Sequence, residues 1–291
     1  MKRFLFYSLV VLTVLGQSCE EQGPAIRFDA DPVSLVDTHY LGPPVQASSR
    51  NVLVEEFTGA TCANCPAARD MLTSISDQNP GRIIPIEIHI FNFQQSKPAH
   101  GARYDLRTEA GTAIGQQIYS AVSGMPSAGF NRLPFQGELL HYTPKWAGAI
   151  DEALKAPGIL NLDLSSQFDP SSRVATIHVR VAYAQAVNEK QYLSLALLED
   201  DLIDIQEFTH GKFDSAYAFK HTLRDFLTPV TGVEFLADLD NKEPGRVYER
   251  WFTYEVPEDF QVKNCQLVAF VHRHDAQSKE VLQVTKAPLA P

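Results

Sequence analysis

Two cysteines three positions apart, Cys62 and Cys65, are the residues of this chain best suited to covalent chemistry. Thiols at this spacing can close a small disulfide with little movement of the backbone. They follow an apolar run, residues 51–57, and precede Pro66, which fits a first helical turn because its missing N–H costs nothing there. Unpaired N–H groups at such a helix start favour a thiolate. The pattern predicts thiol–disulfide exchange, provided that the compartment permits disulfides.

The first residues of the chain bear on that compartment. An apolar stretch, residues 4–15, follows a basic start and is too short to cross a bilayer, so we predict a signal peptide over residues 1–18. Ser18 is a small residue directly before Cys19, as at a bacterial lipoprotein junction. Lipidation of Cys19 would anchor the protein to a membrane without a spanning helix. Simple cleavage after Ser18 is the alternative.

Charge and composition exclude some classes of function. Removal of the signal peptide leaves 23 basic and 35 acidic side chains, a formal charge of −12. Because such a surface repels phosphate backbones, we expect no nucleic-acid partner. The chain is 44% hydrophobic, enough for ordinary cores, and its length favours two domains. The four cysteines divide into one lipidation candidate, one close pair and the lone Cys265, which is no disulfide framework, so stability must come from packing. We expect neither a metal nor a cofactor.

The pattern of apolar residues divides the mature chain into three parts. Residues 19–50 contain four prolines and little periodicity, and are predicted to be a lipidated flexible tether. Strands and helices alternate over residues 51–157, which indicates an α/β domain with a helix over 103–121. Residues 158–291 alternate with period two, which is typical of an all-β sandwich of the immunoglobulin or fibronectin type. Within it, residues 223–227 fit a helical turn or a strand.

The order of elements in the first domain resembles a thioredoxin fold with a helical insertion, over about residues 51–156. A strand, the Cys-x-x-Cys pair, a helix, a second strand and a second helix precede Gly124-Met125-Pro126, and a hairpin and a last helix follow. The resemblance implies that Pro126 is cis and packs beside the cysteines. It also implies that the backbone of Met125 docks a substrate strand.

The same resemblance assigns roles at the cysteines. Cys62 would be the attacking thiolate and Cys65 the resolving thiol. Thr61 stands where thioredoxins usually carry an aromatic residue, and we count it with Met125 among the expected substrate-binding residues. These assignments leave the redox direction and the partner open.

Glu56 lies six residues before Cys62, where many thioredoxins carry a buried acid. Alternation along the strand places Glu56 on one face with Val52 and Val54, and Glu55 on the other. A carboxyl group among apolar neighbours has a raised pKa, so we expect Glu56 to assist deprotonation of Cys65. A partly solvated acid at the end of a strand is the alternative.

Several short motifs occur together in this chain: residues 54–59 with Cys62, Cys65 and Pro66, residues 124–127 followed by Asn131-Arg132, and residues 221–224. These motifs resemble the Bacteroidete twenty-eight-kilodalton outer-membrane-protein family. The resemblance implies an outer-membrane lipoprotein of the cell envelope, periplasmic or surface-exposed, with a thioredoxin-like domain followed by a β-rich one.

Two hypotheses of function follow. In the first, the protein is a thiol–disulfide oxidoreductase acting on envelope proteins that carry thiols or disulfides. In the second, it is a surface binding or adhesin-like lipoprotein in which Cys62–Cys65 is a structural disulfide. An accessible Cys62 beside a cis proline favours exchange, whereas a pair covered by residues 92–102 or by the second domain favours structure.

The remaining cysteine and histidines have simpler interpretations. Cys265 lies in an apolar strand and is predicted to be a buried small hydrophobe, with a third redox thiol facing Cys62 as the alternative. His272 and His274 share a strand face but lack further ligands at metal-site spacing. His221 and Arg224 are expected to support packing between the domains.

Overall fold

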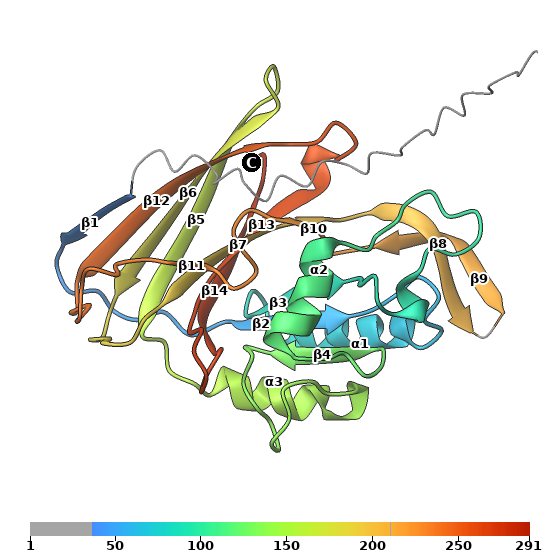
Figure 1. Cartoon of the computed structure of the whole chain (residues 1–291), viewed down its shortest axis with the longest axis horizontal. Coiled ribbons are helices and arrows are strands. Elements are labelled where there is room, and N and C mark those ends of the chain that lie inside the picture. Colours follow the sequence, from blue (N-terminus) through green and yellow to red (C-terminus); the bar gives the residue numbers. More distant parts are fainter. Residues whose placement is uncertain (1–36, 210) are drawn as a thin grey trace, which may run out of the picture. The chain divides into compact units, whose positions relative to one another are not determined.

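The computed structural model describes residues 37–209 and 211–291, which form mostly strands with few helices (Figure 1). The β-rich character predicted for the chain is confirmed. The predicted signal peptide and Cys19 lie outside the described residues. Within the described part, no helix is long and apolar enough to cross a membrane.

The larger sheet has eight strands, and they come from both halves of the chain. Seven follow the order β14-β13-β7-β10-β3-β2-β4, and β11 pairs with β7. β3 pairs in parallel with β2 and with β10, while the other neighbours are antiparallel. The strands are β2 (Val52–Phe57), β3 (Ile83–Ile88), β4 (Ser127–Phe130), β7 (Tyr192–Glu199), β10 (Thr222–Phe226), β11 (Val233–Glu234), β13 (Cys265–His272) and β14 (Val281–Pro288).

A second, four-stranded sheet covers one end of the first. It consists of β1 (Asp37–Leu41), β12 (Arg246–Glu255), β6 (Val174–Tyr183) and β5 (Leu160–Asp169), in that order. Alternate side chains of β5, β6 and β12 share a core with those of β7 and β13, as a period-two pattern requires. β1 belongs to the segment predicted to be a flexible tether, yet it pairs with β12 over five residues.

Helices cover the other end of the large sheet on both faces. On one face, α1 (Cys65–Gln78) and α3 (Trp146–Leu154) bury Leu72 and Ile150 against β2 and β4. On the opposite face lie α2 (Glu109–Ala113) and a single π-helical turn, Ile114–Ile118. Short 3₁₀ turns complete the set, at Gln94–Ser96, Thr143–Lys145 and Val262–Asn264.

The helix predicted over 103–121 is wrong at its start. It begins at Glu109, where the Thr108 hydroxyl accepts a hydrogen bond from Gly111 N at 2.9 Å. The backbone N–H groups of Arg103 and Tyr104 instead donate to the Asp204 carboxylate. This tertiary contact holds the preceding residues out of the helix.

In one further region the structure differs from the sequence prediction, and in another it resolves an alternative that the sequence left open. The predicted hairpin after Pro126 is reduced to single bridges, Ala128 with His141 and Phe135 with Glu138, because β4 pairs with β2. Of residues 223–227, left open between helix and strand, 223–226 fall in β10 and Leu227 follows it. β10 sits between β3 and β7 and so joins strands from the two predicted domains.

The two edge strands of the large sheet, β4 and β14, meet at Asn131. Its backbone carbonyl accepts a hydrogen bond from Val281 N at 2.9 Å, and its side-chain oxygen accepts one from Leu53 N at 2.7 Å. Asn131 and Arg132 both have positive φ, 48° and 52°, which turns the chain sharply after β4. The division into domains at residue 157 stays a prediction, but the sheet itself is continuous across that point.

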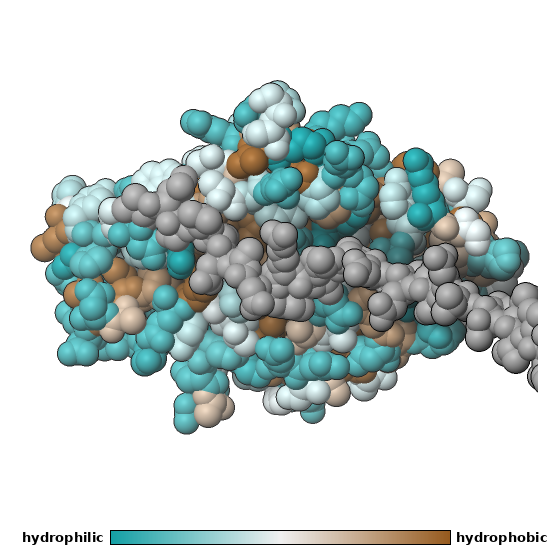
Figure 2. All heavy atoms as spheres, turned by 45° about the horizontal axis from the view of Figure 1, so that its top comes forward, coloured by the Kyte–Doolittle hydropathy of each residue, from teal (hydrophilic) through white to brown (hydrophobic). Residues whose placement is uncertain are grey.

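A hairpin that the sequence analysis did not anticipate lies apart from both sheets. β8 (Leu202–Thr209) and β9 (Lys212–Phe219) pair only with each other. In Figure 1 this hairpin extends beside the end of the helical region. Figure 2 shows that hydrophilic residues cover most of the visible face, with hydrophobic residues in small, separate groups.

Candidate functional site

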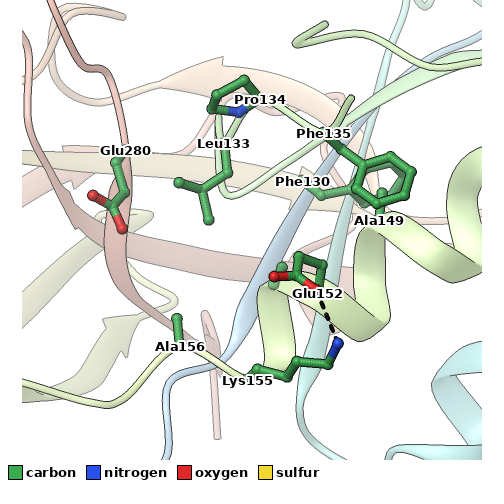
Figure 3. Close-up of a pocket in the computed structure, with 10 residues that line it drawn as sticks. Phe130, Leu133, Pro134, Phe135, Ala149, Glu152, Lys155, Ala156 and Glu280 are labelled. Carbon is green, nitrogen blue, oxygen red and sulfur yellow. Dashed lines mark hydrogen bonds and ion pairs between the residues drawn. The ribbon is translucent and has the colours of Figure 1, made fainter. Parts of the chain in front are cut away.

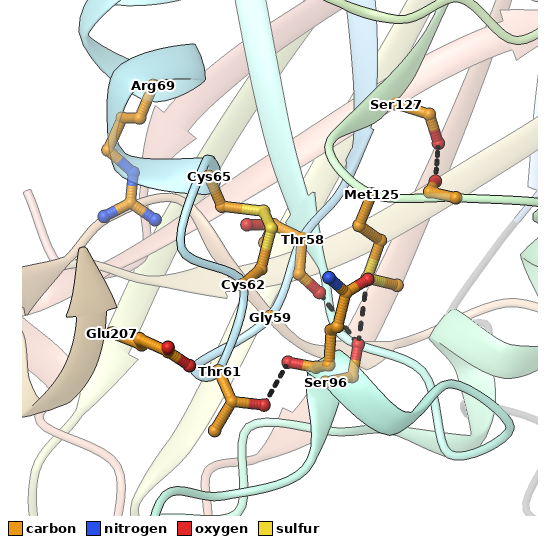
Figure 4. Close-up of a disulfide and its surroundings, with 12 residues drawn as sticks. Thr58, Gly59, Thr61, Cys62, Cys65, Arg69, Ser96, Met125, Ser127 and Glu207 are labelled. Atoms are coloured by element: carbon orange, nitrogen blue, oxygen red, sulfur yellow. Dashed lines mark hydrogen bonds between the residues drawn. A yellow bond between two sulfur atoms is a disulfide. The ribbon is translucent and has the colours of Figure 1, made fainter. Parts of the chain in front are cut away.

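The two cysteines form the predicted disulfide, with a Cα–Cα distance of 5.4 Å (Figure 4). The bond lies in the turn that connects the end of β2 to the first residue of α1. Within this turn, Cys62 N donates to Gly59 O at 3.1 Å and Cys65 N donates to Cys62 O at 3.0 Å. The backbone therefore holds both sulfur-bearing residues in one compact loop.

Both cysteines are buried, with exposed fractions of 1% for Cys62 and 3% for Cys65. One covering segment is the 3₁₀ turn at Gln94–Ser96, whose Gln95 O accepts hydrogen bonds from Thr61 N and Thr61 Oγ1 at 3.0 and 3.1 Å. A Cβ at Gly59 would lie 2.1 Å from that carbonyl oxygen, so only glycine allows this approach.

The second covering segment is β8. The Gln206 side-chain amide donates to Gly59 O and Cys62 O, each at 3.2 Å, and Glu207 N donates to Ala60 O at 2.8 Å. Gln206 is itself 2% exposed. The disulfide is thus capped by a segment of residues 92–102 and by a hairpin from the second half of the chain, the arrangement that the sequence analysis associated with a structural disulfide.

The Met125–Pro126 peptide bond is cis, as predicted. Met125 is buried and belongs to the same apolar cluster as the two cysteines. Figure 4 shows Met125 and Ser96 near the disulfide, and Ser96 Oγ lies 3.5 Å from Met125 Sδ and 2.8 Å from Thr58 O. Met125 is buried and Thr61 is partly exposed, and the roles of both in substrate binding stay predictions.

Glu56 lies on the sheet face that α1 covers, together with Val52 and Val54, as the alternation predicted. It is 1% exposed, and β-sheet register places it directly beside Glu87 on β3. Burial, followed by the charge of Glu87, raises the pKa of Glu56 to about 8. Among the described residues, nothing hydrogen-bonds its Oε2 atom.

Arg69 and Glu87 are site residues that the sequence analysis missed. Arg69, one turn along α1 from Cys65, forms an ion pair with the Glu87 carboxylate. Its guanidinium also lies 4.9 Å from the Tyr217 ring centre, over the covering hairpin. Glu87 could have been noticed as the one acidic residue inside the apolar run of residues 83–88. Arg69 could have been noticed because it lies one helical turn after the second cysteine.

Glu55 points to the opposite face and has a full set of partners. Arg132 donates to both of its carboxylate oxygens at 2.8 and 2.9 Å, and the Tyr119 hydroxyl donates at 2.6 Å. The Arg132 guanidinium also lies 5.0 Å from the ring centre of Phe270 on β13. This network ties β2 to the second half of the chain and indicates a structural role.

Cys265 lies in a different core from the disulfide. It is 2% exposed in the cluster between the two sheets, and burial, with a contribution from Glu199, raises its pKa to about 12. The prediction of a buried small hydrophobe is confirmed, and the alternative of a redox thiol facing Cys62 is wrong.

The histidines singled out in the sequence lie against other parts of the fold: His274 packs against the rings of Tyr192 and His272, and its buried Nδ1 has no hydrogen-bond partner among the described residues. Both ring nitrogens of His272 are engaged, by Ser194 at 2.9 Å and by Arg273 O at 2.8 Å. No group of three metal-binding side chains occurs in residues 37–209 and 211–291. His221 O accepts a hydrogen bond from Glu87 N at 2.8 Å, and Arg224 pairs with Glu199 at 2.7 Å. These contacts lie where β10 meets β3 and β7.

Two pockets lie outside the covered turn. One, of about 400 Å³, opens between α3 and the segment after β4, with an apolar floor that includes Phe130 and Leu133 and a Glu152–Lys155 ion pair at its rim (Figure 3). The other, of about 370 Å³, lies between α1 and β3 and is lined in part by Arg69 and Glu87.

The fold and the site define a β-rich protein with a covered disulfide at the start of α1 and a buried carboxyl pair on the sheet face beneath that helix. The chain belongs to the family described as outer membrane protein Omp28, which matches residues 116–291. The family predicted from the sequence motifs is thereby confirmed, and it indicates association with the outer membrane. No curated protein matches the chain.

Among solved structures, the chain is similar to HBP35 of Porphyromonas gingivalis. The TM-score is 0.66 at 16% sequence identity, over 84% of this chain and 76% of that one. It is also similar to protein AGR_C_4864 from Agrobacterium tumefaciens, with a TM-score of 0.50 and 12% identity over 83% and 95% of the two chains. At these identities the similarity concerns the fold.

Proposed function

We propose that this protein is an outer-membrane lipoprotein, anchored through Cys19, whose thioredoxin-like part exchanges disulfides with envelope proteins. Family membership supports the location. Parallel β2 and β3 joined by α1, then a cis proline before antiparallel β4, support the thioredoxin-like architecture. The mass of the mature N-terminus tests the anchor, because lipidation adds acyl chains to residue 19.

One observation carries the exchange hypothesis: a buried carboxyl group lies beneath the helix that begins at Cys65. Glu56 has an oxygen without a hydrogen-bond partner among the described residues and a pKa raised to about 8. A buried, incompletely satisfied polar group costs free energy, so a purely structural disulfide gives no reason for it. With this pKa the carboxyl group is mostly protonated at neutral pH and can donate its proton.

The reaction that we propose balances as follows. A thiolate of a partner dithiol attacks Cys62 Sγ, the Cys62–Cys65 bond breaks, and Cys65 leaves as a thiolate that takes a proton from Glu56. The second partner thiolate then attacks the partner sulfur of the mixed disulfide and releases Cys62, which is protonated from water. The partner is oxidised to a disulfide, and two electrons reach the cysteine pair. Reversal of these steps reduces a partner disulfide.

Exchange requires displacement of the cover, because Cys62 is 1% exposed. The hairpin β8–β9 is the segment best suited to move, since it forms a sheet of its own. Its contacts with the cysteine turn include three hydrogen bonds from Gln206 and Glu207, and Leu202 and Phe219 also pack against Ala60 of the turn. Partner binding would replace these contacts.

The second candidate is a surface binding protein whose Cys62–Cys65 disulfide is structural. The observation that favours it is the burial of both cysteines under two separate segments. In this case the covering segments stabilise the turn permanently, and the bond serves only to close it.

The reduction potential and its rate constants separate the two candidates. We expect the wild-type disulfide to equilibrate with dithiothreitol at a potential above about −300 mV. Glu56→Gln should slow its reduction at pH 7 by at least about tenfold, because the proton donor is lost. The matched control is Glu258→Gln, which changes an exposed carboxyl group. A potential well below that value, with equal rates in all three proteins, would establish a structural bond.

A further inference from the structure

The buried carboxyl of Glu56, on the sheet face that α1 covers, has a second carboxyl as its neighbour. Glu56 and Glu87 are paired in register on adjacent parallel strands, so their side chains leave the same face of the sheet side by side. Each is 1% exposed. Two carboxylates this close and this deeply buried cannot both be charged without a large cost, so one proton between them is favoured.

The charges around this pair are unequal. Arg69 of α1 forms an ion pair with Glu87, whereas the Oε2 atom of Glu56 has no hydrogen-bond partner among the described residues. The positive charge therefore favours the anion at Glu87 and leaves the proton at Glu56. Burial raises the pKa of both groups, and Arg69 and His221 oppose this rise at Glu87.

Glu87 also lines a pocket that opens to solvent. The pocket has a volume of about 370 Å³ and runs between α1 and β3. Ile83, Pro85 and Glu87 alternate along β3, so all three face it, and Arg69 and Ser76 line it from α1. This opening is separate from the turn that β8 and Gln94–Ser96 cover.

Other titratable groups surround the carboxyl pair from every element packed on it. Asp77 of α1 and Lys286 of β14 line the pocket. Asp200 and His221, whose side chains lie 3.1 Å apart, act on Glu87, and Glu87 in turn contributes to the raised pKa of Tyr217 on β9. His89 on β3 has a pKa lowered to about 3, by burial and then by Arg69, so it stays neutral. Burial raises the pKa of Glu87, and Arg69 and His221 oppose that rise, so these positive charges favour the Glu87 anion over the Glu56 anion.

We infer that Glu56 and Glu87 form a proton-sharing pair for Cys65, and that this pair exchanges protons with water through the pocket between α1 and β3. The inference rests on the proposed exchange function. Glu87 is a positioning residue that acts through Glu56. Its carboxylate takes a proton from pocket water and passes it to Glu56 after Glu56 has protonated the Cys65 thiolate. In the opposite redox direction the proton moves outward along the same groups.

The shared proton is tested without any redox reaction. Carboxyl titrations by ¹³C NMR, on protein labelled at glutamate, should give an apparent pKa near 8 that disappears in Glu56→Gln. In Glu87→Gln the remaining Glu56 pKa should fall by at least one unit, because the neighbouring negative charge is gone and Arg69 is free to pair with Glu56. An unchanged Glu56 pKa in Glu87→Gln would overturn the pairing. Glu258→Gln is the control.

The route of the proton through the pocket between α1 and β3 is tested by filling that pocket with a large side chain. Ser76→Trp fills the pocket, whereas Ser74→Trp places the same side chain elsewhere on α1, outside it. In stopped-flow reduction by dithiothreitol, Ser76→Trp should slow the reaction several-fold and leave its equilibrium position unchanged. Equal rates for the two variants would overturn the route. If the wild-type disulfide does not exchange at all, the proposed function fails, while the NMR titration still decides whether the proton is shared.

Discussion

Glu55 and Glu56 are consecutive residues with opposite surroundings. Strand alternation sends Glu55 to the face where Arg132 and Tyr119 satisfy its oxygens, and sends Glu56 to the face where one oxygen is left without a partner. A bidentate arginine stabilises a buried carboxylate, whereas burial alone stabilises the neutral acid. Position in the strand, rather than residue type, thus makes one glutamate structural and the other a candidate proton donor.

The raised pKa of Glu56 predicts how stability depends on pH. Because the folded state binds this proton more tightly than the unfolded state, the stabilisation is complete below pH 4.5 and is lost as pH rises through about 8. The free energy of unfolding of the wild type should fall in this window, by at most about 1.4 kcal/mol per pH unit from this group.

Glu56→Gln removes the titrating carboxyl group, so the free energy of unfolding of this variant should fall less between pH 4.5 and about pH 8 than that of the wild type. The measurement is urea unfolding at pH 5.5, 7 and 8.5, with Glu258→Gln as the exposed control. Parallel curves for wild type and Glu56→Gln would mean that Glu56 titrates normally.

Among the elements, the hairpin β8–β9 has the largest effect on the site. It pairs with neither sheet, yet it supplies the hydrogen bonds that close the cysteine turn and the rings that pack on Arg69. Its opening must also break the hydrogen bonds that residues 103 and 104 donate to Asp204 and expose Leu202 and Phe219, which pack against Ala60 and Leu106. The hairpin therefore controls access to the disulfide independently of the sheet that positions it.

Loosening the hairpin should make the disulfide easier to reach. Gln206→Ala deletes two hydrogen bonds to the cysteine turn, and we expect dithiothreitol to reduce the variant several-fold faster. Ser215→Ala, an exposed change on β9, is the matched control. Equal rates in both variants would show that the cover opens elsewhere, at Gln94–Ser96.

At the scale of the whole molecule, one sheet joins the two predicted domains. β10 lies between β3 and β7, and Asn131 binds both β2 and the start of β14. The core beneath this sheet mixes residues of both halves, such as Ile86 and Ile114 with Leu198 and Phe270. Each half alone would expose a sheet edge and an apolar face to water.

Fragments test this interdependence. Residues 37–157 and 158–291, expressed separately, should each lack cooperative unfolding, and mixing them should restore a single transition. Circular dichroism followed during urea titration measures both properties. A cooperative transition in the isolated 37–157 fragment would instead establish an independent first domain.

Local sequence patterns predicted the central features of the site. The spacing of Cys62 and Cys65 and the position of Pro66 depend on neighbouring residues, as does the parity of Glu56 on its strand. The disulfide, the start of α1 at Cys65 and the face of Glu56 were therefore correct. Resemblance supplied the cis bond before Pro126 and the family.

Features that depend on distant partners were missed. The alternation of Leu202, Asp204 and Gln206 was a strand signal, but nothing local indicated that this strand would cover Cys62. Nor did the sequence indicate that Asp204 would hold residues 103 and 104 out of the helix. These contacts join residues about 100 to 145 positions apart in the sequence. They arise from tertiary packing, so no local pattern of apolar and polar residues predicts them.

The place of β10 has a consequence for biogenesis. Ribosomes make the chain from its N-terminus, so β2, α1 and β3 emerge long before residues 222–226, which pair with β3. Until then, the backbone N–H and C=O groups on the outer edge of β3 are unpaired and can pair with a strand of another chain. Nascent chains of this protein should thus depend on a holding chaperone for longer than their first hundred residues would require, and late truncations should aggregate rather than leave a working fragment.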